Sequence, residues 1–89
     1  MELLQLKYFQ VVAKYEHIAR SAEQLNVSQP AISLMLSRLE SELGVQLFER
    51  VGRRIVLNDY GRAFLNHVER ILCEEKNAQI ELQEMKDAD

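Results

Sequence analysis

The sequence predicts a mainly α fold in which three short helices are followed by a two-stranded β hairpin and one long helix. Apolar residues recur at helical spacing in three runs before Gly44. The spacing then changes to short β-prone pieces on either side of Gly52, and helical spacing returns from residue 59 onwards. With 89 residues, of which 47% are apolar, the chain is long enough for one small packed domain.

The first two predicted helices cover residues 3–15 and 18–25, where apolar residues line one face of each helix. Neither glycine nor proline separates them, so Glu16 or His17 must take the capping role that serine or threonine usually has. Asn26 follows the second helix, and asparagine tolerates the left-handed conformation that often ends a helix. The chain therefore starts with a longer and a shorter helix, the second ended by a tight turn.

The third predicted helix, residues 28–43, has the clearest start signal in the chain. Ser28 is a strong N-cap residue, and Pro30 suits the first helical turn because its missing N–H has no partner there. Apolar residues then follow at steps of four, three and four, which places them on one face, and Gly44 ends the helix. This face is expected to pack in the core.

The opposite face of the third helix carries small or fork-shaped hydrogen-bonding side chains beside two apolar side chains that we expect to be exposed. These residues are Gln29, Ser33, Ser37, Arg38, Leu34 and Met35. A helix with an apolar back and a hydrogen-bonding front, set across a tight turn from a shorter helix, is typical of a helix-turn-helix that reads the DNA major groove.

Two β-prone pieces, at 45–47 and 55–57, flank Gly52 and predict a two-stranded wing. We expect Arg50, Arg53 and Arg54 at its tip, where arginines can contact phosphates or enter a minor groove. The predicted fold is therefore a winged helix-turn-helix, with three helices and a two-stranded β wing, followed by a long helix.

The long helix begins at Asn58, a good N-cap residue, and Asp59 complements the helix dipole in the first turn. Its length of about 30 residues corresponds to about 45 Å, too long to fold back entirely on so small a domain. A heptad-like stripe, interrupted only by Glu75, predicts that two chains pair through this helix. The stripe consists of Phe64, Val68, Ile71, Ala78, Leu82 and Met85. We divide the chain into a DNA-binding domain, 1–58, and a dimerisation helix, 59–89.

The net charge of −3 is unusual for a protein that binds nucleic acid, but the charge is unevenly distributed. Residues 1–57 hold seven basic and six acidic residues, a net charge of +1, whereas residues 58–89 hold four basic and eight acidic residues, a net charge of −4. No secretory signal or membrane span is predicted, and the single cysteine, Cys73, excludes an internal disulfide framework. We expect a cytoplasmic protein that meets its partners in water.

Enzymatic activity is not expected from this sequence. His17 and His67 have no second ligand at metal-binding spacing, and neither a nucleophile motif nor a phosphate loop is present. Cys73 is interpreted as an ordinary residue of the long helix. We therefore predict no catalytic residue, no metal and no cofactor.

Several segments together resemble the N-terminal domain of LysR-type bacterial transcription regulators, from Leu3 to about Leu72. The matching segments are Leu6-Lys7-Tyr8-Phe9, Ala22-Glu23-Gln24-Leu25, Val27-Ser28-Gln29-Pro30-Ala31-Ile32-Ser33, Leu39-Glu40-Ser41-Glu42-Leu43-Gly44-Val45-Gln46-Leu47-Phe48-Glu49-Arg50 and Gly52-Arg53-Arg54. The resemblance implies a winged helix-turn-helix, a linker helix through which two chains pair, and an effector-binding domain in a longer parent chain. The chain departs from the family pattern at Leu34, which is often basic or polar in relatives, and at His17 and Ala19, where relatives usually carry Ser and Thr.

From these observations we predict that double-stranded DNA is the partner, bound by a homodimer at an interrupted inverted repeat. The residues expected at the base edges are Gln29, Pro30, Ser33 and Leu34. The residues expected at the backbone or minor groove are Arg20, Ser28, Ser37, Arg38, Arg50, Arg53 and Arg54.

Other interpretations of these residues stay open. Ser33, Ser37 and Arg38 can belong to a solvated face, and Arg20 can be solvated as well. Leu34 and Met35 can form a small protein contact, which leads to a rival hypothesis in which the winged helix binds another protein. Salt dependence separates the two hypotheses, because binding to several phosphates weakens steeply with salt.

Overall fold

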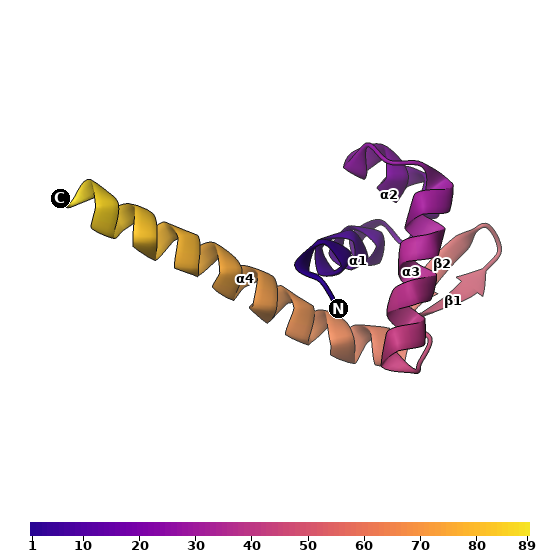
Figure 1. Cartoon of the computed structure of the whole chain (residues 1–89). Helices are drawn as coiled ribbons and strands as arrows, with labels where there is room; N and C mark the ends of the chain where they lie inside the picture. Colours follow the sequence, from indigo (N-terminus) through magenta and orange to yellow (C-terminus); the bar gives the residue numbers. More distant parts are fainter.

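A computed structural model describes residues 1–89 and contains four helices and one antiparallel hairpin. The elements, in chain order, are α1 (Leu3–Tyr15), α2 (Ile18–Leu25), α3 (Gln29–Leu43), β1 (Phe48–Val51), β2 (Arg54–Leu57) and α4 (Asp59–Asp87). The first three helices and the hairpin gather at one end of the molecule, and α4 runs from this body out to the C-terminus (Figure 1). The molecule is therefore elongated, with extents of 55 × 26 × 19 Å.

The predicted caps of α3 and α4 are confirmed. The Ser28 hydroxyl accepts the N–H of Ala31 at 3.2 Å, and the Asn58 side-chain oxygen accepts the N–H of Gly61 at 2.8 Å. Gly44 ends α3 in the left-handed conformation, with φ 75°. Because each cap satisfies a helix end with groups from the same turn, the boundaries of α3 and the start of α4 are set locally.

The α1–α2 turn uses both residues that the sequence offered for capping. Glu16 follows α1 in the left-handed conformation, with φ 51° and ψ 40°. His17 caps α2, since its Nδ1 accepts the N–H of Arg20 at 3.2 Å. Asn26 ends α2 with φ 56°, as predicted.

Replacing Pro30 by glycine should lower the free energy of unfolding by about 0.5–1 kcal/mol, because the fixed φ of proline restricts the unfolded chain. Pro30 lies in the first turn of α3, where its missing N–H leaves no hydrogen bond unmade. Urea denaturation of the wild type and Pro30→Gly measures the difference. Ser28→Ala, which removes the adjacent cap, should cost about 1 kcal/mol and serves as a positive control. An unchanged midpoint for Pro30→Gly would contradict a helical first turn.

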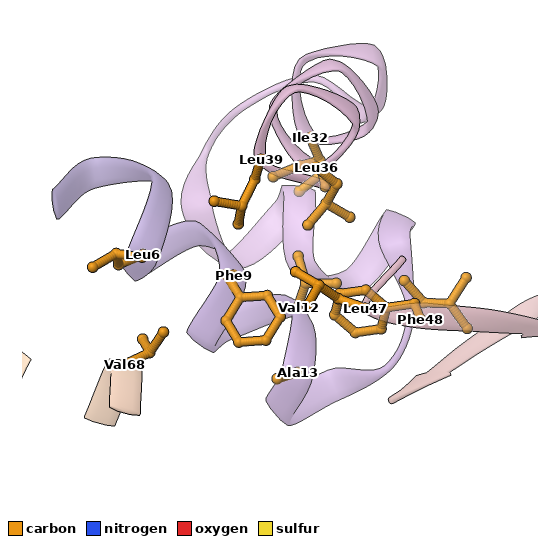
Figure 2. Close-up of a cluster of buried hydrophobic side chains, with 12 residues drawn as sticks. Leu6, Phe9, Val12, Ala13, Ile32, Leu36, Leu39, Leu47, Phe48 and Val68 are labelled. Carbon is orange, nitrogen blue, oxygen red and sulfur yellow. The ribbon is translucent and has the colours of Figure 1, made fainter. Parts of the chain in front are cut away.

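The core contains twelve buried apolar side chains, contributed by α1, α2, α3, the α3–β1 connection, the wing and α4. Phe9 of α1 is fully buried at its centre, with its ring 5.6 Å from that of Phe48 and 5.0 Å from that of Phe64. Leu6 and Val68 lie at one end of this cluster and Phe48 at the other (Figure 2). The core therefore joins the base of the wing and the first half of α4 to the three-helix body.

The wing differs from the prediction at its first strand. Pairing starts at Phe48, opposite Leu57, and ends at Val51, opposite Arg54. The segment at 45–47 is not a strand, because Leu47 is buried in the core and its N–H and C=O bond to Glu40 and Asn58 instead of a neighbouring strand.

Two of the three wing arginines are also displaced from their expected place at the tip. Only Gly52 and Arg53 form the turn, whereas Arg50 and Arg54 lie within the strands. Gly52 has φ 64°, which fits a two-residue hairpin turn with glycine in its first central position.

The stripe on α4 is only partly free, although the sequence predicted that all six of its residues pair with a second chain. Val68 is fully buried, and Phe64 is half-buried against Phe9. The reason is that α1 packs along the first half of α4, where Lys7 Nζ lies 3.5 Å from Glu75 Oε1. The exposed members of the stripe are Ile71, Ala78, Leu82 and Met85. Although α4 has 29 residues, no helix has the length and hydropathy needed to cross a membrane.

Candidate nucleic-acid interface

The two faces of α3 are separated as the sequence predicted. Ile32, Leu36 and Leu39 are buried, with exposed fractions of 0%, 7% and 0%. The predicted contact residues on the opposite side are all exposed: Gln29, Pro30, Ser33, Leu34, Ser37 and Arg38. Their side chains make no hydrogen bond within the chain, so their polar groups are available to a partner.

The expected pair of exposed apolar residues on α3 is in fact a single residue. Leu34 is 52% exposed, but Met35 is half-buried and packs against the core. Met35 lies three residues after Ile32 and therefore at the edge of the buried face. Leu34 alone remains available for an apolar contact.

Arg20 lies in the first turn of α2 and is exposed. Its guanidinium carbon is 5.8 Å from the centre of the Tyr15 ring, close enough for a weak cation–π contact. Ser28 is exposed as well, but its hydroxyl already accepts the capping hydrogen bond from Ala31. A second partner for Ser28 would therefore share this oxygen or receive the hydroxyl proton.

The hairpin register directs Arg50 and Arg54 to opposite faces of the wing. Arg50 pairs with Ile55, and residues directly opposite each other in an antiparallel ladder share a face. Since Ile55 is buried, Arg50 lies on the face turned toward the helical body, where it lines an open groove with Ser33 and Ser37 of α3. This groove has a volume of about 420 Å³.

Arg54 is held by the protein itself. Its Nη2 donates to the Tyr15 carbonyl at 3.3 Å, and its Nε donates to the Glu16 carbonyl at 3.5 Å. A cation at the C-terminal end of α1 also complements the helix dipole. Arg53, in contrast, is exposed in the turn, and its side chain makes no hydrogen bond or ion pair within the chain.

Of the predicted contact residues, the structure brings Ser33, Ser37 and Arg50 together along one groove. Arg53 lies in the turn at the wing tip, and Arg54 is bound to the end of α1. Two acidic residues, Glu40 and Glu49, also line the groove, although neither was predicted to lie near the DNA-binding residues. The Glu40 carboxylate accepts the N–H of Leu47 at 2.6 Å and therefore supports the α3–β1 connection. Glu49 pairs with Val56, on the opposite face of the ladder from Arg50, so its position at the groove depends on how the wing packs against α3 and not on strand pattern alone.

The comparison with protein families is decisive. Residues 3–62 match the family described as bacterial regulatory helix-turn-helix proteins, lysR family. The chain belongs to the LysR family. The matched region of this LysR-type domain contains α1, α2, α3, the complete wing and the first turn of α4.

Related LysR-type sequences are transcriptional regulators by name. The uncharacterized HTH-type transcriptional regulator YybE of Bacillus subtilis (strain 168) is 45% identical over 83 residues, which is 93% of this chain and 28% of YybE. The HTH-type transcriptional regulator CfxR of Cupriavidus necator is 42% identical over 89 residues, which is 100% of this chain and 28% of CfxR. The LysR-type domain therefore spans just over a quarter of the length of these relatives.

Solved structures of LysR-type domains have the same fold. A CbnR DBD–DNA complex matches 96% of this chain and 98% of that chain, with a TM-score of 0.90 and 41% identity. A complex of the BenM DBD with benA site 1 DNA matches 96% and 99%, with a TM-score of 0.91 and 29% identity. The predicted winged helix-turn-helix with a long following helix is thereby confirmed.

Proposed function

We propose that this LysR-type domain binds double-stranded DNA sequence-specifically as a homodimer, with α3 in the major groove and the wing on the backbone or minor groove. The observation that carries the proposal is the exposed, unpaired hydrogen-bonding face of α3, which begins at the Ser28 cap. The CbnR and BenM structures, which are complexes of similar domains with DNA, support the same use of the fold.

In this proposal the residues of α3 divide by position. The first turns of a recognition helix reach base edges, which assigns Gln29, Pro30, Ser33 and Leu34 to the bases. Residues beside these turns and on the wing contact phosphate or the minor groove: Arg20, Ser28, Ser37, Arg38, Arg50, Arg53 and Arg54. Arg54 can serve DNA only with the N–H groups that Tyr15 and Glu16 do not use.

The second copy of the chain pairs with the part of α4 that α1 does not cover. Leu82 and Met85 of α4 are 65% and 63% exposed, and Met1 and Leu4, at the N-terminal end of the chain, are both 56% exposed. These four side chains offer apolar surface to the partner chain. Glu75, which pairs with Lys7 of its own chain, still favours an antiparallel crossing, because a parallel crossing would bring the two Glu75 carboxylates close together. A two-fold dimer places two α3 helices at a set separation, so the DNA site is an interrupted inverted repeat.

The parent protein, in this proposal, is a transcription regulator without catalytic activity that acts in the cytoplasm, where bacterial chromosomal DNA lies. It continues into an effector-binding domain. The relatives support this view, since they are named as transcriptional regulators and the chain covers only 28% of YybE and CfxR.

Selection of bound duplexes from a random pool, followed by a salt titration of the best binder, tests the proposal. If the dimer neutralises about six phosphates, the plot of log affinity against log salt should have a slope of about −5. A selection that enriches no sequence, or a slope near zero, would contradict DNA binding and favour the rival hypothesis of a protein-interaction module.

Gln29→Ala should reduce discrimination at one base pair of each half-site by about 1–3 kcal/mol, the usual worth of a good base contact. Affinity for the cognate duplex and for the three duplexes that carry the other base pairs at that position measures the effect. Gln83→Ala, the same change on the distal part of α4, should leave the base preference unaltered. An equal loss of affinity for every sequence would show that Gln29 does not lie at a base edge.

A further inference from the structure

The wing is attached to the α1–α2 turn by a set of hydrogen bonds that converge on Glu16. The Glu16 carboxylate, through Oε2, accepts the N–H of Leu57 at 2.8 Å, and its backbone carbonyl accepts the N–H of Ile55 at 3.3 Å. The same carbonyl accepts Arg54 Nε at 3.5 Å, while Arg54 Nη2 bonds to the neighbouring Tyr15 carbonyl. Every donor in this set belongs to β2, so one residue of the turn holds one whole strand of the wing.

Glu16 occupies this place at a conformational cost. Its φ of 51° lies in the left-handed region, which disfavours residues with a side chain by about 1–2 kcal/mol relative to a right-handed conformation. Glycine would avoid the cost, yet a glycine has no carboxylate to receive the Leu57 N–H. The hydrogen bond from the Leu57 N–H to the Glu16 carboxylate is partly buried and opposes this conformational cost. It links two residues that are 41 positions apart in the chain.

The other attachments of the wing lie closer to its base than Arg54 does. Phe48 and Ile55 are buried in the core, and the Asn58 side chain donates to the Gln46 carbonyl at 2.8 Å. Ile55, which pairs with Arg50, is the outermost of these residues, and none of the contacts involves the turn, where Arg53 lies. The bonds from the Glu16 and Tyr15 backbone carbonyls to Arg54 are the contacts nearest the tip, and the Glu16 carboxylate holds Leu57, so the two ends of β2 are both attached to the α1–α2 turn.

We infer that Glu16 is a positioning residue for DNA binding, which holds β2 so that Arg53 at the wing tip reaches the DNA backbone or minor groove while α3 occupies the major groove. The inference rests on the proposed function, in which the wing contacts DNA. Glu16 itself touches no DNA; it acts on affinity through Arg53.

A double-mutant cycle between Glu16→Gly and Arg53→Ala tests this inference on the whole chain with the selected duplex. Glu16→Gly removes the carboxylate and so frees the Leu57 end of β2, while the backbone carbonyls that bind Ile55 and Arg54 stay in place. Glycine adopts the left-handed conformation without strain, so the thermal midpoint of this variant should not fall. Its affinity should nevertheless fall about tenfold, as should that of Arg53→Ala, the loss expected for one charge-assisted contact. Glu16→Gly displaces Arg53 from the DNA, and Arg53→Ala removes its side chain, so both changes lose the contact between Arg53 and DNA. The double variant should therefore bind no more weakly than Arg53→Ala alone.

Two further measurements separate positioning from general loss of structure. Glu16→Gln keeps an oxygen that can accept the Leu57 N–H, so it should bind within about twofold of the wild type. The base preference assigned to Gln29 should be unchanged in Glu16→Gly, and hydroxyl-radical protection should be lost only where the wing meets the DNA. A poorly folded domain would lose both features together.

Other outcomes overturn the inference in distinguishable ways. Additive losses in the double variant, or wild-type affinity for Glu16→Gly, would mean that Glu16 does not act through Arg53. If Arg53→Ala binds normally while Gln29→Ala loses base discrimination, the wing contact is absent and the inference fails, but α3 still reads DNA. A wild type that enriches no duplex contradicts the proposed function itself.

Discussion

The double variant Ile71→Asp/Leu82→Asp should be monomeric at tens of micromolar and should bind the inverted repeat at least about a hundredfold more weakly than the wild type. The exposed part of the α4 stripe offers on the order of 200–300 Å² of apolar surface per chain. At about 25 cal/mol per Å², its burial in a dimer is worth on the order of 10 kcal/mol before association entropy is subtracted. Two aspartates on each copy would introduce unpaired charge into this surface, and each recognition helix would then bind one half-site alone.

Sedimentation velocity and binding to the inverted repeat measure the two effects. The matched control is Asn77→Asp/Ile80→Asp, which adds the same charge to α4. Ile80 is 45% exposed and lies about 180° around the helix from Ile71, so this variant should still pair. A monomeric wild type, or an Ile71→Asp/Leu82→Asp variant that pairs and binds the repeat with full affinity, would show that α4 does not pair the two chains.

Gly61→Ala should lower the free energy of unfolding by about 3 kcal/mol or more, although alanine favours helix over glycine. Gly61 is buried in the first turn of α4, and a Cβ at this position would lie 2.1 Å from the Leu47 carbonyl oxygen and 2.6 Å from a methyl group of Leu57. The carbonyl is main chain and already accepts the N–H of Asn58, so no rotamer change can relieve the clash. The clash can be removed only if α4 moves away from the α3–β1 connection.

Thermal denaturation should show this loss as a midpoint lowered by about 12–24 °C for a domain of this size. Gly52→Ala is the control, because a Cβ there meets no atom within 4 Å and only the left-handed φ of 64° opposes it. Its cost should be about 1–2 kcal/mol. A Gly61→Ala protein as stable as the wild type would mean that α4 and Leu47 are not in close contact.

Much of the secondary structure was determined by short stretches of sequence. The Ser28 hydroxyl, the Asn58 side chain and the left-handed Gly44 each act on groups within about four residues along the chain, so residue type alone predicted these helix boundaries. The exposed front of α3 followed from helical periodicity in the same way, because the buried positions at one face leave the others to solvent. The base-edge residues proposed for DNA could therefore be selected before any packing was known.

Tertiary structure decided what periodicity leaves open, namely which partner an apolar face meets. The α4 stripe indicates only that something covers it, and the position of α1 assigns Phe64 and Val68 to the core and Leu82 to the surface. Strand register, with Phe48 and Ile55 on the buried face, placed Arg50 and Arg54 on opposite faces of the wing. The Glu16–Leu57 hydrogen bond joins residues 41 positions apart. Its formation depends on the packing of the whole domain, whereas a cap needs only its own turn of helix.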